Sequence, residues 1–357
     1  MSVWGKNITV DIFGESHGKA IGVVLSGLKP GFPLDMEKIK AMLERRKAGG
    51  ETWSTKRGEA DIFNIVSGVL YGCTTGAPLC ALCENTNAHS GDYPEGLSRP
   101  GHADYTAYAR YGGFNDARGG GAFSGRLTAP LVFAGAVAAQ MLEAKGVYAA
   151  AHIKRLAGVD DKAFDKTEVT REQADALKSS RFPLIDTSKQ DEMESRIAQA
   201  AADGDSVGGI VECAVCGLPA GLGTEYFGGV ESALSSILFA IPAVKGLSFG
   251  AGASLADMRG SEANDEYIIK DGKLAAGTNN NGGILGGITN GMPVVFEVVI
   301  KPTPSISKPQ RTVNLKTMEP ETIEIKGRHD PCIVPRAVPV VEAAALLAIL
   351  DIMVGGL

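Results

Sequence analysis

Three of the five histidines lie in short loops that contain glycine, and each has a carboxylate within two residues. They are His17 beside Glu15, His102 beside Asp104, and His329 beside Asp330. The ordinary pKa of imidazole lies near neutrality, so nearby charges decide whether the ring gives or takes a proton. Glycine lets the backbone turn sharply or approach a ligand closely. Two of the loops also contain arginine, which suits phosphate and carboxylate groups. The pattern predicts an enzyme acting on a phosphorylated or carboxylated small molecule.

The first histidine loop lies between two predicted strands. Alternating hydrophobicity indicates strands at 8–13 and 21–25, so we expect a hairpin whose turn contains the histidine. A helix follows, with Asp35 as its N-cap, and it ends at three consecutive cations, 45–47. These cations either complement the negative end of the helix dipole or bind an anion, and their spacing leaves both readings open.

Further elements are predicted along the rest of the chain. Helices are expected near 103–111, 128–144, 193–202, 230–239 and 340–353, and strands at 209–215 and 294–300. The helix at 128–144 is apolar on nearly all sides, which places it at the centre of the fold. The charged, poorly patterned stretch 160–192 is expected to be a surface excursion.

The composition is that of a globular protein. The 357 residues are 44% hydrophobic and 21% charged, with a formal net charge of -6. Mild acidity and an aromatic content of 6% argue against a nucleic-acid partner. We see no signal peptide, and the apolar run 129–142 is shorter than the ~20 residues that a membrane span needs. We therefore expect a cytoplasmic protein with neither nucleic acid nor membrane as partner.

Two cysteine pairs have a spacing that is also found in zinc sites. They are Cys80 with Cys83 and Cys213 with Cys216. Both pairs lie in apolar, strand-like runs, where residues three apart point to opposite faces of the sheet. We therefore expect buried thiols and no bound metal, and keep a zinc-stabilised structural protein as an alternative.

An internal repeat suggests two related halves. Residues 68–78 match residues 283–293 at six of eleven positions, with a constant offset of 215, and each copy leads into an apolar strand. We hypothesise two related β/α halves, roughly 1–145 and 205–357, packed around central helices in a single domain 1–357.

Several common catalytic patterns are missing or misleading. The sequence contains neither the glycine fingerprint of dinucleotide-binding folds nor a P-loop. The segment 14–18 has the letters of the Gly-x-Ser-x-Gly nucleophile elbow, but an elbow requires a helix after its strand. Because a second strand is predicted there, we do not expect acyl-transfer hydrolysis.

Five segments, taken together and in order, resemble the chorismate synthase family. They are 13–18, 99–105, 282–288, 301–303 and 327–332. The resemblance implies an α/β sandwich with central helices between two sheets, and assembly as a homotetramer. It implies the last step of the shikimate route to aromatic amino acids, in which 5-enolpyruvylshikimate 3-phosphate loses phosphate and a ring hydrogen in a trans-1,4-elimination. It also implies reduced FMN, supplied through NADP(H) at the enzyme itself or through a separate flavin reductase.

The resemblance assigns roles to individual residues. It implies that His17 and His102 are proton donors, and that Asp330 poises the flavin nitrogen that takes the substrate proton. The positions expected to hold substrate are Ser16, Arg46, Arg126 and Arg328. Those expected to line the flavin are Ser124, Ala243, Gly282, Lys301, Pro302, Thr303, Ser305 and Arg328. His329 is expected to be structural.

The chain departs from the family pattern in one loop. Ala122 and Phe123 stand where many members have arginine and serine, and Thr52 stands where arginine is common. A lost guanidinium at a phosphate contact costs about 1.5–3 kcal/mol if nothing compensates. A catalytically impaired homologue that still binds flavin and anions therefore stays open as an alternative.

Overall fold

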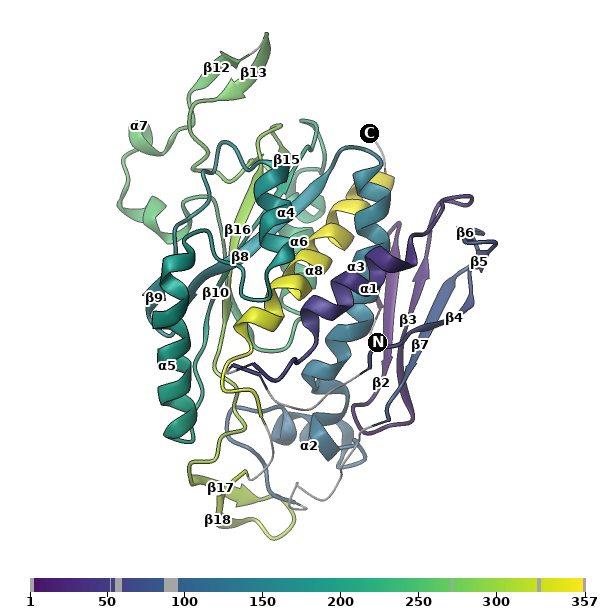
Figure 1. Ribbon diagram of the computed structural model, residues 1–357, viewed down its shortest axis with the longest axis vertical. Helices are drawn as coiled ribbons and strands as arrows, with labels where there is room; N and C mark the ends of the chain where they lie inside the picture. The colour runs from purple at the N-terminus through teal and green to yellow at the C-terminus, as the bar shows by residue number, and fades with distance from the viewer. Residues whose placement is uncertain are drawn as a thin grey trace.

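The computed structural model describes residues 3–51, 53–54, 60–86, 96–270, 272–325 and 329–355. Two five-stranded antiparallel sheets enclose a layer of helices (Figure 1). In spatial order, the first sheet consists of β1 (Val3–Trp4), β2 (Thr9–Gly14), β3 (Ala20–Ser26), β7 (Leu79–Glu84) and β4 (Asn64–Ser67). The second consists of β11 (Val244–Phe249), β16 (Val294–Ile300), β10 (Gly209–Cys216), β8 (Tyr148–Leu156) and β9 (Val159–Asp160). The predicted sandwich of two sheets around central helices is therefore confirmed.

The layer between the sheets contains α1 (Met36–Arg46), α3 (Thr128–Glu143), α6 (Val230–Leu238) and α8 (Val334–Val354). The helices α3 and α8 are apolar because the fold buries them along almost their whole length, whereas α1 is amphipathic and exposes Glu37, Lys38 and Lys40. The helices α3 and α8 cross at Gly135, where an added Cβ would lie 2.3 Å from Cβ of Ala343. Two helical stretches, Arg118–Glu143 and Val334–Val354, are long and apolar enough to cross a membrane, but 67% and 83% of their most apolar windows are buried inside the fold. Their hydrophobicity serves the protein core.

The segment 160–192 differs from the predicted surface excursion. It contains α4 (Arg171–Ser179), a single 3-10 turn η4 (Thr187–Lys189) and the start of α5 (Gln190–Ala202). Phe164, Val169 and Leu177 are buried against the outer face of the second sheet. The apolar residues are spaced too irregularly for one helical or strand period, which is why the pattern was missed.

The remaining elements lie at the ends of the sandwich. They are α2 (Asp104–Tyr111), α7 (Gly260–Ala263), the 3-10 segments η2 (Arg118–Phe123), η3 (Gly125–Leu127), η5 (Tyr226–Gly228) and η6 (Gly252–Asp257), and the hairpins β5 (Val69–Leu70) with β6 (Cys73–Thr74), β12 (Tyr267–Lys270) with β13 (Lys273–Ala276), β14 (Ile284–Leu285) with β15 (Ile288–Thr289), and β17 (Gln310–Asn314) with β18 (Glu319–Ile323). The α2 end of the molecule also holds the β2–β3 turn (Figure 1).

The two matching sequence segments form matching structures. Residues 68–78 contain the hairpin β5–β6 and lead into β7, and residues 283–293 contain β14–β15 and lead into β16. The sheets also share a strand order, since β2-β3-β7-β4 corresponds to β8-β10-β16-β11. These equivalences connect the two halves strand by strand.

The cysteine pairs lie in the strands where the sequence placed them. Cys80 and Cys83 are in β7 of the first sheet, and Cys213 and Cys216 are in β10 of the second. Because the two pairs belong to sheets separated by the helix layer, they do not form one four-cysteine site. Burial raises the pKa of Cys216 to about 12, as expected for a thiol removed from water.

Candidate active site

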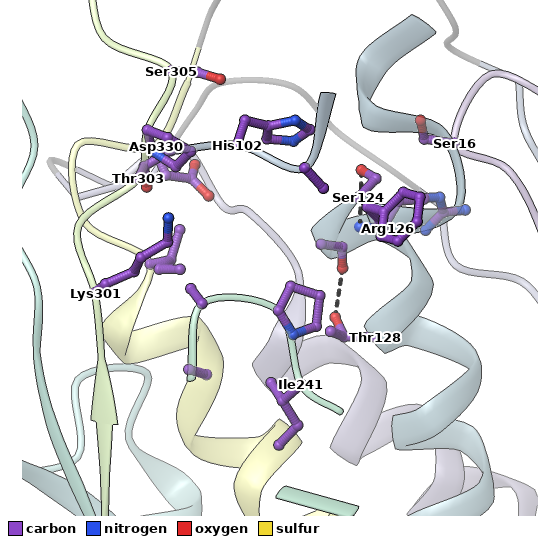
Figure 2. A pocket seen from close by; sticks show the side chains of 18 of the residues that line it. Ser16, His102, Ser124, Arg126, Thr128, Ile241, Lys301, Thr303, Ser305 and Asp330 are labelled. Atoms are coloured by element: carbon purple, nitrogen blue, oxygen red, sulfur yellow. Dashed lines mark hydrogen bonds between the residues drawn. The ribbon is translucent and has the colours of Figure 1, made fainter. Parts of the chain in front are cut away.

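A cavity of about 720 Å³ opens at the α2 end of the sandwich, where loops from both halves meet (Figure 2). Eleven predicted site residues that are far apart in the sequence line it: Ser16, His17, Arg46, His102, Ser124, Arg126, Ala243, Lys301, Thr303, Ser305 and Asp330. His329 lines it as well. Lys301, Thr303 and Asp330 lie on one side in Figure 2, Ser124 and Arg126 on the other, and His102 between them. The fold thus gathers most of the predicted site.

His17 is held in the turn between β2 and β3, as the predicted hairpin requires. Asn85 fixes this turn, because its side-chain amide donates to the carbonyls of Glu15 and Gly18, each at 3.0 Å. Ser16 Oγ donates to the carbonyl of Gly119 at 3.1 Å. The imidazole of His17 is only 8% exposed. Since β3 follows the turn and no helix does, the nucleophile-elbow reading is wrong.

His102 is held by a carboxylate and an arginine of its own loop. Its Nδ1 lies 2.6 Å from Oδ1 of Asp104. Arg99 forks the same carboxylate, donating from Nε to Oδ2 at 2.7 Å and from a terminal nitrogen to Oδ1 at 2.8 Å. Burial acts to raise the pKa of Asp104, but the hydrogen bonds from Arg99 and His102 outweigh it and hold the pKa well below its ordinary value.

Three consecutive glycines bring the two histidines to one wall of the cavity. Gly119, Gly120 and Gly121 all have left-handed φ values, +59°, +88° and +53°. A Cβ on Gly119 would lie 2.5 Å from Nε2 of His17, and one on Gly120 would lie 3.1 Å from Nε2 of His102. The imidazoles therefore lie against adjacent residues, although 85 positions separate them in the sequence. The run was visible in the sequence, but its role as this wall was not.

Two arginines of the cavity share one buried acid. Asp61 Oδ2 accepts from Arg46 at 3.2 Å, and Oδ1 accepts from Arg126. Arg126 also donates to Oδ1 of Asn85 at 3.2 Å, which links it to the His17 turn. Asp61, whose backbone φ is +46°, holds both guanidiniums at the cavity. Sequence reasoning missed Asp61, since no recognisable pattern surrounds it.

The cation cluster at the end of α1 has two functions. Arg46 is 1% exposed and lines the cavity, which supports the anion-binding reading. Arg45 instead pairs with the buried Glu342 of α8, and Lys47 pairs with Glu44. Only the middle cation of the three reaches the site.

The opposite side of the cavity holds Asp330 and two lysines. Arg336, which the sequence left without a role, pairs with Asp330 and donates from Nε to the carbonyl of Arg46 at 2.9 Å. Burial lowers the pKa of Lys301, and the charge of nearby Lys245 lowers it further. Lys245 also lines the cavity, and sequence analysis missed it. A cavity with this many cations favours anionic ligands.

Two predicted residues, Gly282 and Pro302, do not line the cavity. Gly282 lies near β14, where a Cβ would meet the backbone of Gly250 at 2.5 Å, so this glycine is required by packing. Pro302 does not line the cavity and packs against Gly208. Arg328 lies outside the described residues, as does Thr52. Ala122 and Phe123, the departures from the family pattern, both line the cavity.

The fold and site are those of an α/β protein with paired histidines beside a cavity lined by arginines and lysines. Comparison identifies the family. A family model described as chorismate synthase matches residues 8–354. A chorismate synthase from Thermococcus kodakarensis is 47% identical over 350 residues, covering 97% of this chain and 96% of the relative. One from Dehalococcoides mccartyi is 44% identical over 350 residues, covering 98% and 95%.

A solved structure agrees with the sequence comparisons. A crystal structure of chorismate synthase superposes with a TM-score of 0.78 at 25% identity, covering 99% of this chain and 93% of that one. The chain belongs to the chorismate synthase family.

Proposed function

We propose that the chain converts 5-enolpyruvylshikimate 3-phosphate to chorismate, with reduced FMN bound in the same cavity. The reaction is a trans-1,4-elimination that breaks a carbon–oxygen bond to phosphate, so the enzyme would be a lyase. The observation that carries this proposal is the placement of two imidazoles on consecutive glycines, Gly119 and Gly120, beside the arginines of the cavity. Family membership supports the same reaction.

The residues present fit a flavin and a phosphorylated substrate. The cavity of about 720 Å³ is within the usual range for cofactor sites. Oγ1 of Thr303 is buried and has no hydrogen-bond partner among the described residues, which suits a polar ligand atom. Ile241 and Pro242 add apolar surface. Reduced FMN, when bound, supplies the electron density and the proton acceptor that removal of an unactivated C–H hydrogen requires.

We assign the flavin contacts to the residues on the Lys301 side of the cavity and to Ser124 and Ala243. Asp330, which Arg336 fixes, would poise the flavin nitrogen that takes the substrate proton. Gly282 and Pro302 are left out of this assignment because they do not line the cavity.

We assign Arg46, Arg126 and Ser16 to the phosphate and carboxylates of the substrate. Guanidinium groups form charge-assisted, bidentate hydrogen bonds to such oxyanions. Because Asp61 already holds both arginines in place, little ordering is required when substrate binds. As the phosphate departs, the same cations would stabilise the charge that gathers on it.

We assign His17 and His102 to proton donation, the first toward the departing phosphate and the second toward the flavin. His17 stands in the same turn as Ser16, the residue we assign to the substrate. His102 stands between Asp330 and Ser124, two of the residues that we assign to the flavin (Figure 2).

The test is an anaerobic assay of chorismate formation with chemically reduced FMN. We expect chorismate and inorganic phosphate in equal amounts, and a fall in turnover of about tenfold or more in both His17→Ala and His102→Ala, since each removes a proton donor. Near-wild-type activity in both variants would contradict the assigned roles. Binding of flavin and substrate without turnover would show an impaired homologue instead.

We further propose a cytoplasmic homotetramer. The hairpin β12–β13 extends from the sandwich (Figure 1), with Ile269 72% and Leu274 66% exposed. An isolated two-stranded hairpin is marginal in water, so contact with another copy of the chain would stabilise it. Light scattering should give four times the chain mass of 37.1 kDa. A monomer would contradict this proposal.

We propose that a separate reductase supplies the reduced flavin, because the sequence lacks a dinucleotide fingerprint. NADPH and oxidised FMN without a reductase should then give no chorismate. Turnover under those conditions would show that the enzyme reduces its own flavin.

A further inference from the structure

The carboxylate of Asp104 has two partners, an arginine and the imidazole of His102. The side chains of Arg99, His102 and Asp104 are 5%, 15% and 12% exposed, so the cluster is largely shielded from water. Asp104 also accepts from its own loop, at the backbone N–H of Arg99, at 2.9 Å. The four bonds hold the loop and the ring as one unit.

The contacts determine which ring nitrogen carries the proton. The pKa of Asp104 is depressed, so its Oδ1 is an acceptor. An unprotonated Nδ1 of His102 would place two lone pairs 2.6 Å apart, which is repulsive, whereas a protonated Nδ1 makes a short, charge-assisted hydrogen bond. A terminal nitrogen of Arg99 also lies 3.0 Å from Nδ1 and, as a donor, would favour an unprotonated Nδ1, but the shorter contact with the charged carboxylate outweighs it.

The other end of the ring faces the cavity wall. Nε2 of His102 lies beside Gly120, where an added Cβ would be 3.1 Å away, and Cβ of Ser124 lies 3.7 Å from that same point. Ser124 lines the cavity. Since Asp104 engages Nδ1, Nε2 is the nitrogen that can exchange a proton with a ligand.

We propose that Asp104 is a positioning residue: it holds the proton on Nδ1 of His102, so that the doubly protonated ring gives its catalytic proton from Nε2 and is left as the neutral tautomer with the proton on Nδ1. This inference rests on the proposed function in one respect, the assignment of His102 as a proton donor. Without such a partner a neutral histidine favours the proton on Nε2. In that tautomer the unprotonated nitrogen is Nδ1, which faces Asp104 and not the cavity, so proton exchange with a ligand would be misplaced.

The tautomer can be measured without any substrate. Nitrogen-15 NMR of the histidine rings distinguishes the two neutral forms, and the His102 signals are assigned by their loss in His102→Gln. In the wild-type protein, above the titration of the ring, we expect the proton on Nδ1. In Asp104→Asn, which keeps the size of the side chain, we expect a shift to Nε2. A wild-type ring protonated on Nε2, or a tautomer unchanged in Asp104→Asn, would overturn the proposal.

Turnover provides the second test. Asp104→Asn should lower kcat about tenfold to a hundredfold, as misplacement of a proton donor does. In the His102→Ala background the same substitution should change kcat less than twofold, because residues that act through one another are not additive. An equal loss in both backgrounds would mean that Asp104 does not act through His102. Asp160→Asn is the matched control, since Asp160 forks Arg155 in the same way far from the cavity.

The two tests separate this inference from the proposed function. If His102→Ala keeps full activity, the proposed role of His102 in the reaction is wrong. The NMR measurement of the tautomer still tests whether Asp104 fixes the proton on Nδ1 of His102. If the tautomer is wrong but His102→Ala is inactive, the proposed function stands and the inference fails.

Discussion

Replacing Gly119 with alanine should disable the enzyme by moving His17. The added Cβ would lie 2.5 Å from Nε2 of His17 and 2.9 Å from Oγ of Ser16. Ordinary contact begins at 3.4 Å, so the ring must move by about 0.9 Å. A misplacement of about 1 Å in a catalytic group can cost about a hundredfold in rate. We therefore expect a hundredfold lower kcat in Gly119→Ala.

The control must separate this displacement from backbone strain. Gly112, the C-cap of α2, has φ +60° and ψ 29°, close to the +59° and 15° of Gly119. A Cβ on Gly112 would have Phe114 at 3.9 Å as its nearest neighbour, which is ordinary contact. Both variants carry the cost of alanine in a left-handed conformation, about 1–2 kcal/mol of unfolding free energy.

The assay compares the two variants by urea unfolding and by anaerobic turnover with reduced FMN. Gly112→Ala should be destabilised but keep kcat near that of the wild type. Gly119→Ala should be destabilised and lose turnover. If both variants have the same kcat, the glycines Gly119 to Gly121 do not set the position of His17, and the reasoning fails.

Three further predictions concern stability and substrate binding. Gly135→Ala forces a Cβ into Ala343 and should lower the unfolding free energy by about 1–3 kcal/mol. The control Gly260→Ala has open space around its Cβ and should lower it by less than about 0.5 kcal/mol. Urea titration of both variants measures the difference. Asp61→Asn removes the negative charge that the two buried guanidiniums share and should raise the substrate KM at least tenfold; an unchanged KM would refute its role. His152 is buried between two carboxylates, and although burial opposes its charge, these partners raise its pKa. Its contribution to the free energy of unfolding should therefore be complete below about pH 6.5 and be lost at higher pH. If the difference in unfolding free energy between the wild type and His152→Gln does not narrow as the pH rises, this prediction is wrong.

Local patterns predicted the elements that surround the His17 turn. The hairpin β2–β3 and the helix after Asp35 form as expected, and Asp35 accepts from the backbone N–H groups of Glu37 and Lys38. In α1 one face is buried and the other exposed, so helical spacing reports the structure directly.

One strand that is buried on both faces escaped prediction, and one buried helix was predicted to begin too late. The strand β8 contains Ala149, Ala150 and Ala151, which have weak strand preference and are buried on both faces of the sheet, so no alternation appears. The helix α8 begins at Val334, six residues before the predicted start, because Pro335 is tolerated in a first turn. Tertiary packing decides both cases.

The site was predictable where residues match positions of the family pattern. His17, His102 and Asp330 were found in this way, and the cavity brings them together. Asp61 and Arg336 were not, because their roles come from contacts with residues distant in sequence. The sequence around one residue does not indicate which distant residue will contact it in the folded protein.

The strand order that the two sheets share suggests how the His17 turn came to lie at the open end of the first sheet. We propose an internal duplication in which the second half begins at β8, earlier than the predicted residue 205, because β8 occupies the place of β2 in an otherwise identical strand order. The β2–β3 connection is then the short turn with His17, whereas the β8–β10 connection is the long segment that carries α4 and α5. A short turn leaves the end of the first sheet open for the histidine to face α2 and the glycine wall. The long connection instead covers the outer face of the second sheet. Divergence in this one connection would have left the first half to supply both histidines, while loops of the second half supply Lys301, Thr303 and Asp330.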